Sequence, residues 1–189
     1  MTVLHRERVL RAATTSFLAH GYRSSVDEIA RRAGVAKQTV YQHFPNKDEL
    51  FKEVARDLAQ RVLVELDPAM DLREGLLRFG IAYRGRALGA QGIATFRTLV
   101  PEVPRFRALA RTMYANSAGE MVRRLAAHLE KAMDAGRLRR EEPRFAAEML
   151  LSLLAGHDRI KRLFAVTDPE NETSRTERIV DTFLRAFSK

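Results

Sequence analysis

The sequence predicts an all-α protein of about nine helices, and three observations support this fold class. Apolar residues recur with helical spacing along most of the chain, and no segment shows the strict alternation of a half-buried strand. Gly and Pro residues interrupt the pattern at intervals, from Gly21 to Pro169. Hydrophobic residues make up 46% and charged residues 30% of the 189 residues, which is typical of a globular protein.

The expected helices form two groups. Three short helices occupy the first 45 residues and are expected over about 6–20, 26–33 and 36–44. Longer helices follow, over about 47–66, 72–88, 93–100, 105–135, 144–166 and 176–187. We therefore expect a three-helix domain over 1–46 and a helical-bundle domain over 47–189, with a loose linker at 167–174.

Composition narrows the classes of function. The chain has no cysteine, which excludes disulfides, thiolate metal sites and thiol catalysis. Its net charge of +9 favours a polyanionic partner, most commonly nucleic acid, although many basic proteins have no such ligand. The amphipathic start does not resemble a signal peptide, and no apolar run could span a bilayer. We expect a cytoplasmic protein with no membrane partner and no cofactor.

Residues 25–35 carry the signals of a helix-turn-helix. Ser25 and Glu28 form an S-x-x-E capping box at the start of the second helix. The two crossing helices need a small residue at their contact and a residue that tolerates a left-handed turn. Ala30 and Gly34 stand where these demands fall, so the sequence predicts a turn between helices 26–33 and 36–44.

The helix at 36–44 is unusually polar for its length. Val40 and Phe44 suffice to pack it, so its polar side chains are available for donors and acceptors of a partner, as major-groove reading requires. An exposed polar helix on a bundle is the alternative. Pro45 ends the helix, and Asn46 with Glu49 caps the next one, where Lys47 makes the first turn a candidate phosphate site. The polar residues are Lys37, Gln38, Thr39, Tyr41, Gln42 and His43.

The run "TSFLAHGYRSSVDEIARRAGVAKQTVYQHFPNKDELF", residues 15–51, resembles the DNA-binding domain of the tetracycline-repressor (TetR) family. The similarity extends over Gly-Tyr, Ile-Ala, Ala-Gly-Val, Thr-x-Tyr-x-His-Phe and Lys-x-Glu-Leu. The resemblance implies that base edges are read near Lys37 and Gln38. It also implies phosphate contacts from Ser25, Thr39, Tyr41, His43 and Lys47.

One departure from the family pattern has a physical cost. Ala36 stands where many members have a Ser cap, so the helix start is expected to lose about 1 kcal/mol. Residues about 96–166 also resemble the C-terminal domain of AefR-like members, which concerns architecture rather than a ligand.

The bundle is expected to supply a dimer face and a ligand pocket. In "FAAEMLLSLLA", residues 145–155, only Glu148 and Ser152 are polar, so this helix should be covered on two sides. We expect a homodimer through the last two helices, with a buried central helix in a monomer as the alternative. The family resemblance implies an inducer pocket, for which core packing is the competing explanation. Its candidate residues are Phe79, Tyr83, Phe96, Met113, Tyr114 and His128.

These features predict a repressor that a small-molecule inducer releases from double-stranded operator DNA. The ligand would favour a conformation in which the two DNA-reading helices of the dimer do not match successive major grooves. Helix 47–66 would transmit this change from the ligand pocket. A constitutive or architectural DNA-binding protein and an activator are the alternatives. An enzyme is not expected, because the five His residues show no metal spacing and "GHD" at 156–158 has no nucleophile elbow nearby.

Overall fold

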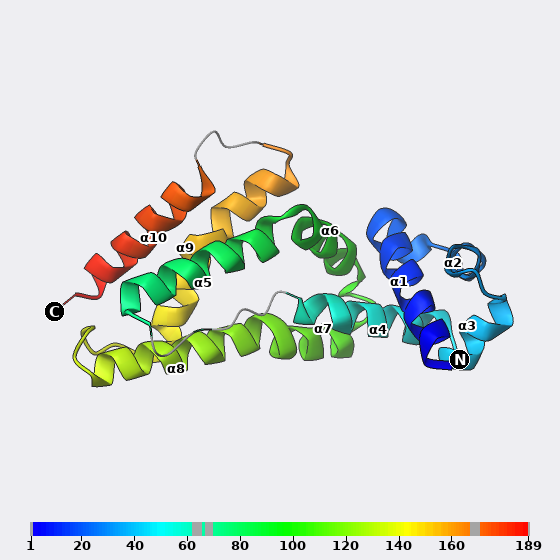
Figure 1. The fold of residues 1–189 in the computed structure, drawn as a ribbon, viewed down its shortest axis with the longest axis horizontal. Coiled ribbons are helices and arrows are strands. Elements are labelled where there is room, and N and C mark those ends of the chain that lie inside the picture. Colours follow the sequence, from blue (N-terminus) through cyan, green and yellow to red (C-terminus); the bar gives the residue numbers. More distant parts are fainter. Residues whose placement is uncertain (1, 62–65, 67–69, 167–170, 189) are drawn as a thin grey trace. The chain divides into compact units, whose positions relative to one another are not determined.

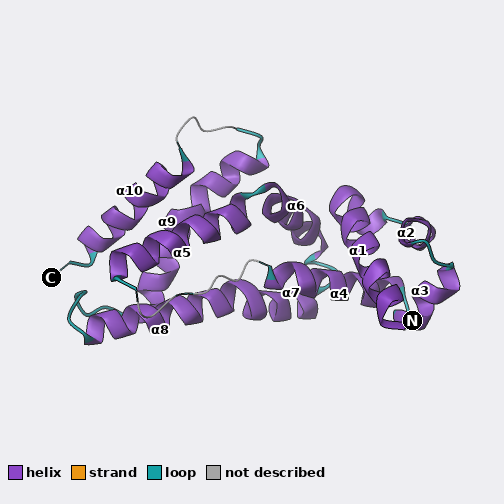
Figure 2. Ribbon diagram, in the orientation of Figure 1, coloured by secondary structure: helices purple, strands orange, loops and turns teal. Residues whose placement is uncertain are grey.

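A computed structural model describes residues 2–61, 66, 70–166 and 171–188, except for the side chains of residues 2, 3 and 59. These residues form helices and connecting turns, and no strand occurs among them (Figures 1 and 2). The predicted all-α class is therefore confirmed. The chain divides into two compact units, 1–61 with 94–113 and 62–93 with 114–189.

The first unit contains the three helices that the sequence predicts for the first 45 residues, followed by the helix predicted to begin at residue 47. The three are α1 (Thr2–His20), α2 (Val26–Ala33) and α3 (Lys37–His43), and the fourth is α4 (Lys47–Gln60). The C-terminal part of α6 (Ala90–Leu99) and most of α7 (Arg107–Tyr114) belong to the same unit. The expected extension of the fourth helix to 66 falls largely on 62–65, outside the described residues.

The core of this unit joins residues from both stretches of the chain. Phe17 and Phe51 are buried, with ring centroids 5.2 Å apart in an edge-to-face arrangement. Phe106, which follows a 3₁₀ turn at Val100–Glu102, stacks on Phe51 at 5.4 Å. Leu109 of α7 lies in the same cluster. Residues 94–113 therefore complete the core beneath α1 and α4.

The second unit packs α5 (Leu72–Leu88), α8 (Glu120–Asp134), α9 (Pro143–Leu163) and α10 (Glu172–Ala186) around another core. The expected helix over 105–135 is divided, because a π-helical turn, Ala115–Gly119, joins α7 to α8. This turn is rich in Asn, Ser and Gly, which favour an α-helix weakly. The expected linker also ends early, since Asn171 accepts hydrogen bonds from Thr173 and Ser174 and so caps α10.

Helices α5 and α10 approach closely because Gly80 has no side chain. A Cβ at position 80 would lie 2.8 Å from Cγ2 of Thr176 and 3.1 Å from Cδ2 of Leu154. A Cβ added at Gly85 of the same helix would meet nothing within 4 Å. Gly80 is therefore required for the helix spacing, whereas Gly85 is not.

A buried ion-pair network ties α5, α9 and α10 together. Arg84 is only 3% exposed, and its guanidinium bonds Asp158 at 2.7 Å as well as the main-chain carbonyl of Leu154. Its other side pairs with Glu172 of α10, and Arg175 of α10 also binds Asp158. The three helices thus share a charged cluster in which each buried charge has partners.

In the described residues, no helix has both the length and the apolar character needed to cross a membrane.

Candidate nucleic-acid interface

The turn between α2 and α3 has the geometry that the sequence predicts. Gly34 adopts the left-handed conformation at φ 63° and ψ 42°, and its amide donates to the carbonyl of Arg31. The Val35 amide donates to the Ala30 carbonyl at 3.1 Å, which closes the C-terminus of α2. Arg8 of α1 binds the Gly34 carbonyl at 3.2 Å and fixes the turn against α1.

Helix α3 is anchored by two apolar residues and exposes much of its polar surface. Val40 and Phe44 are 1% and 2% exposed, as expected from the sequence. Gln38 is exposed, and Tyr41 retains 42% of its accessible surface. A rigid helix that projects polar side chains outward can place donors and acceptors against base edges and phosphates.

Lys37 is paired with an acidic side chain of α2. Its ammonium donates to Asp27 of α2 at 2.9 Å, and this hydrogen bond raises the Lys37 pKa. The pair is exposed, so it can exchange for another anion at little cost. Thr39 and His43, by contrast, are half-buried on the same helix.

Side-chain caps determine where α2 and α4 begin. The Ser25 hydroxyl accepts from the Glu28 amide at 3.1 Å, and Asn46 accepts from the Glu49 amide at 2.9 Å. The start of α3 lacks such a cap, because Ala36 has no side-chain acceptor. The cap predicted to be missing is thus missing in the structure as well.

Lys47 lies at the first turn of α4 and remains available for an anion. Its ammonium is 4.3 Å from the centre of the Tyr22 ring, a cation–π contact. Burial, together with the positive charge of Arg105, lowers the Lys47 pKa. Among the described residues Lys47 forms no ion pair, whereas Lys37 and Lys52 each pair with a carboxylate.

Sequence reasoning missed Tyr22, Asp48 and Arg105, which surround Lys47. The Tyr22 hydroxyl donates to Asp48, and Arg105 donates to both groups. Burial and the Asp48 carboxylate raise the Tyr22 pKa to about 12. The neighbours Arg105 and Phe106 carry a sequence signal, because a buried Phe106 holds the charged Arg105 next to the core. The partner of Arg105, Asp48, lies 57 residues earlier and could not be identified from one sequence.

The residues predicted to bind an inducer occupy different environments. In the second unit, Phe79 and Tyr83 are buried and stacked at 5.8 Å, whereas Tyr114 is 56% exposed. His128 is half-buried, and burial with nearby Arg137 lowers its pKa. In the first unit, Phe96 is exposed and Met113 packs against the core. Their role in ligand binding stays a prediction.

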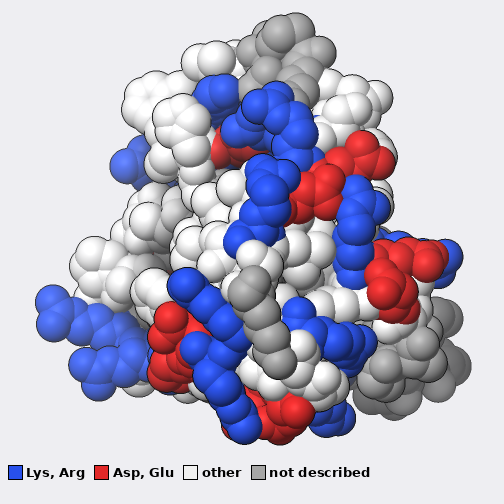
Figure 3. Space-filling model, turned by 90° about the vertical axis from the view of Figure 1, so that its left-hand side faces the viewer, with Lys and Arg blue, Asp and Glu red and all other residues white. Residues whose placement is uncertain are grey.

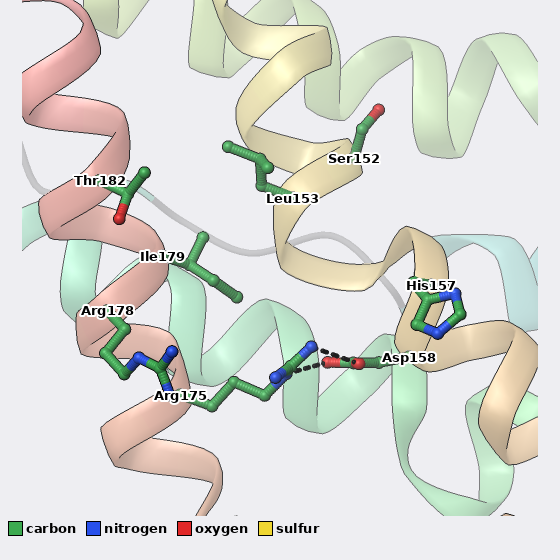
Figure 4. Close-up of a pocket in the computed structure, with 8 residues that line it drawn as sticks. All are labelled: Ser152, Leu153, His157, Asp158, Arg175, Arg178, Ile179 and Thr182. Carbon is green, nitrogen blue, oxygen red and sulfur yellow. Dashed lines mark hydrogen bonds and ion pairs between the residues drawn. The ribbon is translucent and has the colours of Figure 1, made fainter.

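A groove of about 340 Å³ opens between α9 and α10 and contains none of those six residues (Figure 4). Arg175 reaches from α10 to Asp158 on α9, and Leu153 and Ile179 extend into the space between these two helices. The groove therefore combines an apolar wall with charges that already have partners. Its lining residues are Ser152, Leu153, His157, Asp158, Arg175, Arg178, Ile179 and Thr182.

Basic side chains are not confined to the first unit. On the face shown in Figure 3, Lys and Arg are spread over the surface with Asp and Glu between them. Net charge alone therefore does not locate the nucleic-acid site, and α3 is distinguished by its turn, its buried anchors and its exposed polar side chains.

Comparison with protein families gives two matches. Residues 9–54 match the bacterial regulatory proteins of the tetR family. Residues 74–189 match the C-terminal domain of AefR-like transcriptional repressors.

Related sequences are also named as transcriptional regulators. The HTH-type transcriptional regulator Mb2274c of Mycobacterium bovis is 31% identical over 145 residues, which cover 76% of this chain and 75% of the relative. YhgD of Bacillus subtilis, another HTH-type regulator, is 38% identical over 72 residues, and the match spans only 38% of either chain.

Solved structures share the fold over nearly the whole chain. A TetR-family regulator from Mesorhizobium loti has a TM-score of 0.85 with 24% identity. The match covers 100% of this chain and 99% of the Mesorhizobium chain. The flavonoid-responsive regulator FrrA has a TM-score of 0.80 with 32% identity, and 97% of each chain is covered.

Fold and site together define a helix-turn-helix transcriptional regulator. The chain belongs to the TetR family, with an AefR-like C-terminal domain. Members of this family are transcriptional regulators and not enzymes, as the sequence predicts.

Proposed function

We propose that the protein is a repressor that binds operator DNA as a homodimer and is released by a small-molecule inducer. The observation that carries the proposal is α3, whose apolar anchors are buried while Gln38 and Tyr41 face outward. The similarity to AefR-like repressors supports repression. FrrA, similar over 97% of its length, responds to flavonoids, which supports a response to a small molecule.

We assign the DNA contacts as the sequence predicts them. Lys37 and Gln38 would read base edges, with Lys37 exchanging Asp27 for its DNA partner. The phosphate contacts would come from Ser25, Thr39, Tyr41, His43 and Lys47. Residues 1–46 would carry this function, and residues 47–189 would bind the inducer and dimerise.

The dimer would form through α9 and α10. Phe145, Leu153 and Ile160 lie on one side of α9 and are 54%, 42% and 51% exposed. A line of exposed apolar residues on a helix that is buried on its other side is typical of a surface that another chain covers. Val180 and Phe183 of α10 are already buried in their own unit, so α9 supplies most of the apolar contact.

The first experiment selects binding duplexes from a random pool with purified protein and measures binding by fluorescence anisotropy across a salt series. We expect one enriched sequence, tight binding to it and weak binding to a scrambled duplex. Tyr41→Ala and Lys47→Ala should each weaken binding at least tenfold, whereas Lys131→Ala, an exposed lysine of α8, should not. Equal binding to both duplexes would falsify sequence reading and favour an architectural protein.

A second experiment tests the dimer face by sedimentation. Ile160→Arg should dissociate the dimer, because a charge would be buried against the partner. Ile81→Arg on α5 introduces the same charge at a similarly exposed isoleucine, 41% exposed, and should leave the dimer intact. A dimer that persists in Ile160→Arg would exclude this face.

A third experiment separates the repressor from its alternatives. Compounds that raise the melting temperature of the purified protein, flavonoids among them, are added to the DNA complex. Release of the duplex supports an inducible repressor. Tighter binding or activated transcription from a reporter supports an activator, and no stabilising compound supports a constitutive protein.

A further inference from the structure

The phosphate site proposed at Lys47 is bordered by a charged cluster drawn from three parts of the chain. Tyr22 comes from the 3₁₀ turn after α1, and Asp48 comes from the first turn of α4. Arg105 comes from the segment just before α7, which lies far from the helix-turn-helix in sequence. All of these residues belong to the first compact unit.

The Asp48 carboxylate has two partners. It accepts a hydrogen bond from the Tyr22 hydroxyl and another from Arg105 at 3.2 Å. Arg105 also donates to the Tyr22 oxygen at 3.2 Å. Because the Tyr22 pKa is raised to about 12, its hydroxyl keeps its proton and stays a donor.

The Tyr22 ring lies against both cations of the site. The Arg105 guanidinium is 4.2 Å from the ring centre, and the Lys47 ammonium is 4.3 Å from the same centre. Phe51 and Phe106 pack around the ring at 5.3 Å and 5.6 Å, which holds it in place. The position of Lys47 is therefore tied to that of Arg105 through one aromatic side chain.

The charge balance at this point affects an incoming phosphate. Asp48 is the residue next to Lys47, so an uncompensated carboxylate there would repel a phosphate and attract the ammonium. Arg105 supplies the opposite charge and directs the carboxylate toward itself and Tyr22. Lys47 is consequently not held in an ion pair with Asp48, and its ammonium can bind an external anion.

We propose that Arg105 is a positioning residue for DNA binding, because it neutralises Asp48 and so leaves Lys47 free to bind phosphate. This inference rests on the proposed function, in which Lys47 contacts the DNA backbone. It extends the nucleic-acid site beyond the helix-turn-helix to the segment before α7.

The test compares variants of the full chain on the selected duplex, again by anisotropy. Arg105→Gln should weaken binding roughly tenfold, because each protomer then presents an uncompensated carboxylate beside the phosphate. Arg107→Gln removes an equal charge two residues away, where the side chain is exposed, and should change the affinity by less than about twofold.

The decisive variant is the double substitution Arg105→Gln with Asp48→Asn. If Arg105 acts by neutralising Asp48, removal of both charges restores binding to within about twofold of wild type. A merely structural loss would not be rescued in this way. Nor would the loss of a direct phosphate contact, which would also lower the salt slope by about one per site. Failure of the rescue overturns the proposal.

Lys47→Ala separates failure of the proposed phosphate contact from failure of the proposed role of Arg105. If this variant binds as well as wild type, the proposed phosphate contact is wrong, whatever Arg105 does. If it binds weakly while Arg105→Gln binds normally, the contact stands and the role of Arg105 is wrong.

Discussion

The two compact units differ in where their charged side chains lie. The first unit keeps its ion pairs at the surface, as with Lys37 and Asp27, and among its described residues the buried ones are apolar, aromatic or hydroxyl-bearing but not charged. The second unit buries Arg84 beside Asp158 and connects three helices through that pair. The difference teaches that the first unit leaves its cations accessible to a ligand, whereas the second uses a cation to define how its helices pack.

The largest expected effect follows from removing the buried arginine. Arg84→Met should lower the free energy of unfolding by about 3 kcal/mol, because the Leu154 carbonyl loses the Arg84 hydrogen bond and Asp158 loses one of the two arginines that pair with it. Arg73→Met on the same helix breaks an ion pair with Asp181 that is about half exposed and should cost far less than Arg84→Met, because solvent screens the pair. Urea unfolding measures the loss of unfolding free energy in both variants. Equal losses would show that the buried and the exposed ion pairs contribute alike.

The next effect concerns the spacing of α5 and α10. Gly80→Ala should destabilise the second unit by about 1–3 kcal/mol, because the added methyl group meets the buried Thr176. Gly85→Ala adds the same group where nothing is nearby and should stabilise the helix by about 0.5–1 kcal/mol. Thermal unfolding should move the two variants in opposite directions, and a shared direction would show that the spacing is adaptable.

Smaller effects are expected from the caps of the first unit. Asn46→Ala should cost about 1 kcal/mol, because the Glu49 amide loses its acceptor. Ala36→Ser supplies the cap that α3 lacks and should gain a similar amount. Chemical unfolding measures the stability of both variants. If Ala36→Ser is no more stable than wild type, the first amides of α3 already have other hydrogen-bond acceptors.

The smallest expected effect is acid sensitivity of the second unit. Burial raises the Asp158 pKa, but hydrogen bonds from Arg175 and Arg84 outweigh it and leave the pKa below its usual value. A carboxyl with a lowered pKa stabilises the fold above its unfolded pKa of about 4, and that contribution disappears as the pH falls further. Melting temperatures from pH 7 to 2 should show a steeper acid decline in wild type than in Asp158→Asn.

Local signals account for what could be predicted from the sequence. Ser25, Gly34 and Asn46 act on amides or carbonyls within a few residues, so their spacing is visible in the chain itself. Val40 and Phe44 follow from the helical period. These features predicted the helix-turn-helix and its exposed polar residues.

Pairings across long separations could not be predicted in this way. No local pattern around Asp158 in "GHD" identifies its partner Arg84, which lies 74 residues earlier. The signal that was overlooked is a charged residue within the buried stripe of α5, beside Tyr83 and Ala87. A charge in such a stripe requires a partner, but periodicity does not identify which one.

The buried arginine also has a consequence for synthesis of the chain on the ribosome. Arg84 is made 88 residues before Glu172, its partner in α10. At roughly 5–20 residues per second, this interval lasts about 4–18 s. During that time the nascent second unit carries an arginine that lacks this partner, while the sequence from α1 to α4 has already been translated. The charged cluster of the second unit can therefore be completed only after α10 has been synthesised.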